Sequence, residues 1–136
     1  MATLDTDTKL SSLFSGMIVS QDNEFSMVNV DIGGAIIKVP DVSRRYSGKK
    51  IFIRINADAI SIALVPPKKI SIQNCIEAMI VGISVDAQSP YALVKARFSD
   101  LEITARITRS GVESLKLTEG KTVYMLIKSV SFDSQL

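Results

Sequence analysis

The sequence predicts an all-β protein built from two tandem copies of a small five-stranded unit. Most of the chain consists of short runs in which apolar and polar residues alternate, and turn residues separate these runs. The two halves also share sequence. Many short strands at such spacing are typical of a small β-barrel or β-sandwich.

The first half contains alternating runs joined by recognisable turns. The run Glu24–Ile32, EFSMVNVDI, ends at Gly33-Gly34, and this turn leads into AIIKV as a hairpin. DVSRRYS, from Asp41 to Ser47, is the next segment and is expected to be a short helical turn. GKKIFIRIN and AISIALV then read as strands, and Pro66-Pro67 ends the series because proline cannot donate to a strand ladder.

The second half follows the same order. ISIQNCIEAMIVGISV, YALVKARF and LEITARIT read as strands, and RSGVESLKL reads as a short helical turn. The final run Thr122–Phe132, TVYMLIKSVSF, alternates throughout and is expected to be a single strand.

Two matched segments reveal the internal repeat. GMIV at Gly16–Val19 corresponds to AMIV at Ala78–Val81, and GKKIFIRIN at Gly48–Asn56 corresponds to GKTVYMLIK at Gly120–Lys128. The offset grows from 62 to 72 residues, so ten extra residues are expected around 85–100 of the second copy. Each copy has about 55 residues, and so small a core is only marginally stable by itself. Packing between the copies, and against a second chain, is expected to supply the missing burial.

The repeat predicts three segments: a linker-like stretch at 1–12, a first subdomain at 13–66 and a second at 67–136. The boundary falls at Pro66-Pro67.

Composition excludes several classes of protein. The chain has no histidine and one cysteine, Cys75, which argues against histidine-based catalysis, soft-metal sites and an internal disulfide. It also lacks a glycine-rich phosphate loop and a carboxylate cluster, so we expect no enzyme activity and no metal site. A net charge of +2 and eight aromatic residues do not favour a nucleic-acid partner. The absence of a signal-like start and of a long apolar run predicts a cytoplasmic protein without membrane insertion.

Lys128 interrupts an otherwise apolar face of the final run. Alternation places it beside Leu126 and Val130, where an unpaired buried ammonium would cost several kcal/mol. Two interpretations remain open: Lys128 extends to solvent on its flexible stem, or it meets an anion. The matching residue of the first copy is Asn56, so the charge belongs to one copy alone.

Other polar groups also have two interpretations. Ser110 and Glu113 fit a helix capping box, yet the same helix start, next to Thr108, offers free N–H groups to an anion. Ser71, Gln73 and Asn74 form a polar patch that serves either strand-end hydrogen bonding or ligand binding.

Four segments resemble the molybdate-binding Mop, or TOBE, domain: SIQN at 71–74, ARIT at 105–108, LKLTEGKTVY at 115–124 and LIKSVSF at 126–132. The first half, with GMIV, VDIGG and IIKVP, is similar to the first of two tandem copies. The arrangement is most similar to the C-terminal regulatory domain of the ATP-binding subunit of molybdate transporters.

The resemblance implies an OB-like five-stranded β-barrel for each copy, a homodimer, and oxyanion sites between subunits. Its implied ligand is molybdate or tungstate, with no cofactor, and its implied partners are transporter ATPase and permease subunits in a longer protein. Carried over to this sequence, Ser71 and Lys128 approach the oxyanion from one subunit, with Gln73 and Asn74 in the same motif. Thr108, Ser110 or Gly111, and Ser129 approach from the other.

This sequence departs from the family pattern at two positions. Gln73 stands where the family often has arginine. This replacement removes a positive charge and a guanidinium that can donate two parallel hydrogen bonds. Gly111 stands at the usual helix-start serine, with Ser110 one place earlier. The alternative function is therefore a TOBE dimerisation and regulatory module without an oxyanion, in an ATPase that serves another substrate.

Overall fold

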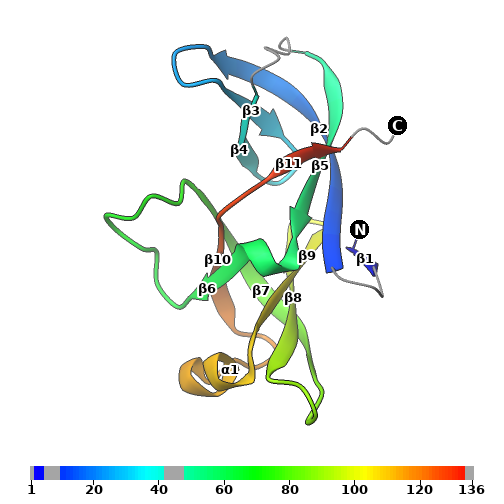
Figure 1. Ribbon diagram of the computed structural model, residues 1–136, viewed down its shortest axis with the longest axis vertical. Helices are drawn as coiled ribbons and strands as arrows, with labels where there is room; N and C mark the ends of the chain where they lie inside the picture. Colours follow the sequence, from blue (N-terminus) through cyan, green and yellow to red (C-terminus); the bar gives the residue numbers. More distant parts are fainter. Residues whose placement is uncertain (1, 5–9, 42–47, 134–136) are drawn as a thin grey trace.

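The computed structural model describes residues 2–4, 10–41 and 48–133, and two curled antiparallel sheets make up most of it (Figure 1). The first sheet has the strand order β11-β5-β2-β3-β4, with β1 added beside β2, and the second has the order β6-β10-β7-β8-β9. The elements of the first half are β1 (Ala2–Leu4), β2 (Leu10–Asp22), β3 (Met27–Asp31), β4 (Ile36–Pro40), β5 (Lys50–Asn56), the 3₁₀ turn η1 (Ala57–Ala59) and β6 (Ile60–Ala63). Those of the second half are β7 (Asn74–Val85), β8 (Tyr91–Phe98), β9 (Leu101–Thr108), α1 (Arg109–Leu115), β10 (Thr122–Ile127) and β11 (Ser131–Asp133).

The expected all-β class and the five-stranded units are confirmed. Strands at opposite edges of each sheet come together, β4 with β11 and β6 with β9, so both sheets curl toward barrels. The expected helical stretch RSGVESLKL forms α1 over its first seven residues, and Lys116 ends the helix as its C-cap. The other one, DVSRRYS, lies outside the described residues apart from Asp41.

Alternation of side chains accounts for how the strands pack. In β5, Ile51, Ile53 and Ile55 are buried while the residues between them are partly exposed. Buried side chains of both halves form one apolar cluster, since Phe14 of β2 and Phe98 of β8 have ring centroids 6.1 Å apart. The two sheets therefore share a core, as the small size of each copy predicts.

The repeat recurs in the hydrogen bonds. The backbone N–H of Ile18 donates to Lys49 O, and the matching N–H of Ile80 donates to Lys121 O, both at 2.9 Å. A β-bulge follows each of these isoleucines. The adjoining Gly48 and Gly120 both have positive φ, 86° and 88°, which only glycine adopts readily.

The ten extra residues of the second copy are divided between two places, which corrects the expectation of one insertion around 85–100. Register pairs Val30 with Ile37 and Ala96 with Ile103, an offset of 66 residues for both positions. Four extra residues therefore lengthen the β7–β8 hairpin, and six lie beyond Ile103, in the segment containing the end of β9 and α1. Both places are loop-adjacent, where insertions cost little.

The two halves exchange their fifth strands. β6 follows β5 in sequence but pairs with β10 of the second sheet, and β11 follows β10 but pairs with β5 of the first (Figure 1). The sheets thus do not divide at Pro66-Pro67, and the subdomain limits 13–66 and 67–136 remain a prediction about the sequence. The stretch 1–12, expected to be a linker, includes β1 and the start of β2.

This exchange also corrects the expectation of one final strand. β10 ends at Ile127, and the chain then crosses to the first sheet, where β11 pairs with the free edge of β5. Lys128 lies at the crossover and is exposed, so it does not interrupt a buried apolar face. The physical reason is that β5 has an unpaired edge, which the last three-residue strand covers. Arg54 of β5 reinforces this pairing, because its Nε and Nη2 both lie 2.6 Å from Asp133 Oδ2.

Candidate functional site

A pocket of about 290 Å³ lies where the crossover after β10 meets the segment that leads into β7 and the β3–β4 hairpin. Three groups of residues line it: Ser71, Ile72, Gln73 and Asn74 before and at the start of β7; Ile127, Lys128, Ser129 and Val130 at the crossover; and Met27, Lys38 and Pro40 from β3 and β4. The fold therefore brings together five of the eight residues that the sequence identified: Ser71, Gln73, Asn74, Lys128 and Ser129.

Strand exchange positions Lys128. Its backbone N–H donates to Ala59 O at 2.8 Å, which anchors the crossover to η1 of the first half. The side chain is exposed and lines the pocket, so its charge remains solvated when the pocket is empty.

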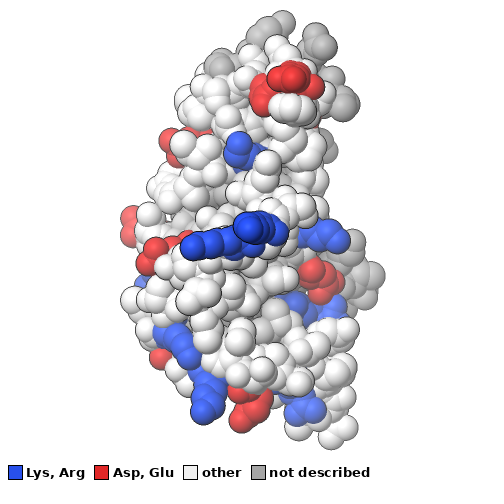
Figure 2. Space-filling view, turned by 90° about the vertical axis from the view of Figure 1, so that its left-hand side faces the viewer, with Lys and Arg blue, Asp and Glu red and all other residues white. Residues whose placement is uncertain are grey.

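The charge of the pocket is positive. Its lining includes two ammonium groups, those of Lys38 and Lys128, and contains no carboxylate among the described residues. The loop between β6 and β7 adds the exposed Lys68 and Lys69 nearby in sequence. Basic side chains form a band across the middle of the face seen in Figure 2, toward which this loop projects. Such a distribution attracts anions.

Asn74 joins the two halves of the pocket. Its Oδ1 accepts from the backbone N–H of Lys38 at 2.8 Å, and its Nδ2 donates to the backbone oxygen of Lys38 at 2.9 Å. These are the outward-facing groups of β4, an edge strand of the first sheet. The strand-end interpretation therefore applies to the Asn74 amide, whereas Ser71 and Gln73 are exposed side chains at the pocket.

Thr108, Ser110 and Gly111 form a separate cluster at the start of α1, at the far end of the second sheet (Figure 1). None of the three lines the pocket that holds Lys128. The proposed capping box is wrong: Thr108 is the N-cap, and its Oγ1 accepts from the N–H of Gly111 at 2.9 Å. The helix begins at Arg109, so Ser110 lies in its first turn and is not its cap. The Thr108 hydroxyl still has its proton to donate.

Replacing Thr108 by valine should lower the free energy of unfolding by about 1 kcal/mol, because a helix N-cap is lost. Thr108→Ser should retain the stability, and Ser110→Ala should leave it nearly unchanged. Urea unfolding followed by circular dichroism measures all three variants. A larger loss for Ser110→Ala than for Thr108→Val would contradict the assignment of the cap.

Lys38 is the charged residue of the pocket that sequence analysis did not identify. It lies in a plain alternating strand, with Ile37 and Val39 buried on the opposite face. No local pattern in IIKVP marks it, because its relevance depends on a contact with residues 36 positions away.

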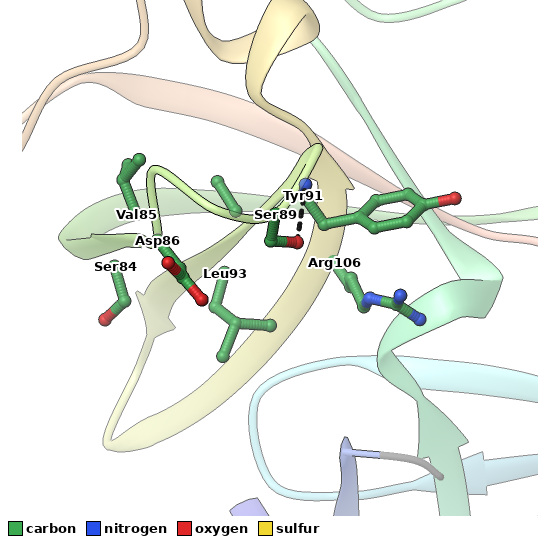
Figure 3. A pocket seen from close by; sticks show the side chains of 8 residues that line it. Ser84, Val85, Asp86, Ser89, Tyr91, Leu93 and Arg106 are labelled. Carbon is green, nitrogen blue, oxygen red and sulfur yellow. Dashed lines mark hydrogen bonds between the residues drawn. The ribbon is translucent and has the colours of Figure 1, made fainter.

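A second pocket, between the β7–β8 hairpin and Arg106, is less suited to an anion (Figure 3). Asp86 lines it, and the guanidinium of Arg106 is already occupied by the Tyr91 ring, 4.0 Å away, and by Asp58 Oδ1 at 3.0 Å. The hydrogen bond marked in Figure 3 runs from the Tyr91 N–H to Ser89 Oγ at 3.0 Å, and the Ser89 N–H also donates to the backbone oxygen of Asp86 at 2.9 Å.

The described residues contain no group of three or more side chains that could hold a metal ion. Partial burial raises the pKa of the Cys75 thiol above its usual value, which lowers its reactivity at neutral pH. Across the part of the chain that is described, no helix has the length and apolar character needed to cross a membrane.

Comparison with known proteins identifies relatives that match most of this chain, in sequence and in fold. Molybdenum import ATP-binding protein ModC of Brucella abortus is 31% identical over 121 residues, covering 89% of this chain, and ModC of Hahella chejuensis is 28% identical over the same length. The chain spans about a third of these relatives, 33% and 34% of their length. The solved structure of the cytoplasmic molybdate-binding protein ModG, with molybdate bound, covers 90% of this chain at a TM-score of 0.76 and 18% identity. That likeness confirms the pair of OB-like barrels.

The match to a known domain falls on the second half. Residues 70–132 match the TOBE domain, and this range contains the segment just before β7, the strands β7 to β10, α1 and the crossover with Lys128. It does not contain β6, the edge strand that the first half contributes to the second sheet. Residues 70–132 of this chain therefore form a TOBE domain, and the first sheet repeats the strand order of the second.

Proposed function

We propose that this chain is a non-catalytic module that binds molybdate or tungstate in the pocket between its two halves. The observation that carries the proposal is the pocket's composition: two ammonium groups, two serine hydroxyls and the Gln73 amide, with no carboxylate among the described residues that line it. Relatives named molybdenum import ATP-binding proteins, and a structural neighbour with molybdate bound, support this choice of ligand.

The available groups suit a tetrahedral dianion. Charge-assisted hydrogen bonds contribute about 1.5–3 kcal/mol each. Four to six such bonds, after the cost of ordering the side chains, are consistent with micromolar binding at about −8 kcal/mol. Ser71, Gln73 and Lys128 are the proposed ligands within one chain, with Asn74 holding the pocket together. Ser129 is proposed with them because it lines the same pocket, whereas the family resemblance assigns it to the other subunit.

We further propose a homodimer in which a second chain brings Thr108, Ser110 and Gly111 to this pocket. Within one chain these residues lie apart from Lys128, so a complete set of ligands requires another copy. The exposed Met17 and Met79, at matching positions of β2 and β7, are 48% and 49% accessible and offer apolar surface for the contact.

Light scattering at micromolar concentration should give twice the mass of the chain, and a persistent monomer would count against the dimer.

In the cell, the module is proposed to be cytoplasmic and to act within a molybdate importer, on its ATP-binding and permease subunits, or as a free-standing binding protein. ATP hydrolysis would belong to another domain, because this sequence has no phosphate loop.

Calorimetric titration of the purified protein with sodium molybdate tests the function. We expect saturable binding in the micromolar range, and weaker binding of sodium phosphate at the same ionic strength.

The second candidate function, a dimerisation module without a ligand, is favoured by Gln73 in place of arginine. A dimer that gives no heat with molybdate or tungstate would establish that alternative.

A further inference from the structure

We infer that Lys38 of the first half provides the second positive charge of the oxyanion pocket and makes the site selective for dianions. This inference rests on the proposed function and adds to it a ligand from the other repeat. It also accounts for Gln73, because the charge absent from that position is supplied from β4.

The backbone of β4 determines where the Lys38 side chain extends. Ile37 and Val39 are 1% and 0% exposed and fix one face of the strand against the core. Lys38 therefore points to the opposite face, where it lines the pocket with Lys128. The two hydrogen bonds from the Asn74 amide hold the Lys38 backbone against the start of β7. Only the stem of the lysine remains to be ordered when an anion binds.

The ammonium groups of Lys38 and Lys128 are available to a ligand. Neither has an ion pair with any residue that the structure describes. By contrast, Arg54, Arg97 and Arg106 are each bound to a carboxylate. Charges already neutralised by a neighbour attract an external anion weakly, whereas two unneutralised charges at one pocket attract it strongly.

The counterpart position in the other half lacks these features. The register places Thr104 of β9 where β4 has Lys38, and the repeat places Asn56 where the crossover has Lys128. Ser12 stands where β7 has Asn74. The hydroxyls of Ser12 and Thr104 are both buried and have no hydrogen-bond partner, so the amide connection is also absent there. Among the described residues the two-lysine pocket is therefore built once, and we expect one site of this kind per chain.

Two lysines favour a dianion over a monoanion of the same shape. Coulomb attraction scales with the charge of the ligand, so each ammonium contributes about twice as much to a dianion. Molybdate and perrhenate are both tetrahedral oxyanions but carry charges of −2 and −1. The difference between their affinities thus reports the positive charge at the site.

The experiment titrates wild-type protein, Lys38→Gln and Lys50→Gln with sodium molybdate and with sodium perrhenate at fixed ionic strength. Lys50 is an exposed lysine on β5 that lines a different pocket, so it is the matched control. We expect Lys38→Gln to weaken molybdate binding about tenfold, as for the loss of one charge-assisted bond. Perrhenate binding should weaken about threefold, which narrows the preference for the dianion. Lys50→Gln should match wild type with both anions.

Three outcomes are informative. Equal molybdate affinity for Lys38→Gln and wild type would overturn the role of Lys38 while leaving the proposed function intact. Equal losses for both anions would overturn the assignment of charge selectivity. No molybdate binding by wild type would overturn the proposed function and this inference together. Circular dichroism of Lys38→Gln confirms that the variant is folded, as expected for an exposed side chain.

Discussion

Lys128→Met should reduce by half or more the rise in melting temperature that molybdate produces in the wild-type protein. A ligand that binds only the folded state stabilises it by mass action, by about 2.7 kcal/mol when its concentration is 100 times Kd. Removing the ammonium at the crossover removes a principal attraction for the anion. Without ligand, the stability of the variant should stay close to that of wild type, because Lys128 is exposed in the chain and its charge is already solvated. Thermal unfolding with and without sodium molybdate measures both effects.

Asn56→Met is the matched control, since Asn56 occupies the corresponding position of the first copy and lies outside the pocket. This variant should keep the full response to molybdate. If Lys128→Met responds as strongly as wild type, Lys128 only extends to solvent and is not a ligand. The double-barrel fold would be unaffected by that result.

Ile53→Ala and Met125→Ala should each lower the free energy of unfolding by about 2–5 kcal/mol, and each should do so in one transition. The two residues occupy matching positions of β5 and β10, and both are 0% exposed. Because β6 and β11 are exchanged between the sheets, each sheet loses an edge strand when the other half of the sequence unfolds. A cavity in either sheet's part of the shared core should therefore destabilise the whole chain. Urea unfolding followed by circular dichroism and by tyrosine fluorescence should give coincident curves.

Val85→Ala is the control for Met125→Ala, since Val85 is 57% exposed and belongs to β7, the neighbouring strand of the same sheet. It should change the stability by less than about 1 kcal/mol. Two separate transitions, of which only one shifts in each core variant, would indicate that the halves fold independently, as the limits 13–66 and 67–136 would suggest.

Local patterns were sufficient to predict most of the strands. Alternation in EFSMVNVDI and YALVKARF places alternate side chains in the core, and the Gly33-Gly34 turn closes a hairpin between β3 and β4. The repeat was also visible in the sequence, as matched segments around Ile18 and Ile80 and around Gly48 and Gly120. These segments are similar because they make the same backbone hydrogen bonds in both copies. These features depend on residues close in sequence or on direct similarity between segments. The N-cap was misplaced by two residues because Thr108 and Ser110 are equally suitable side chains, and only the backbone decides between them.

The candidate site was predictable only in part. Ser71, Gln73, Lys128 and Ser129 carry a family pattern, and the fold brings them to one pocket. Lys38 carries no such pattern, since an outward lysine on a strand is ordinary. Its place in the pocket follows from the two hydrogen bonds between Asn74 and β4.

The sequence alone determined the all-β class, the two copies, the turns and the polar residues of the family motif. These follow from the period of the side chains and the conformational freedom of glycine and proline, which act within a few residues. The tertiary structure decided which strand pairs with which. β11 continues the alternation of β10 but joins the first sheet, and β6 follows β5 but joins the second sheet. Alternation predicts that a strand has a buried face but does not specify which strand pairs with it. Any free strand edge offers the same backbone donors and acceptors. That choice puts Lys128 at a crossover beside Lys38, and so assembles the pocket from both halves of the chain.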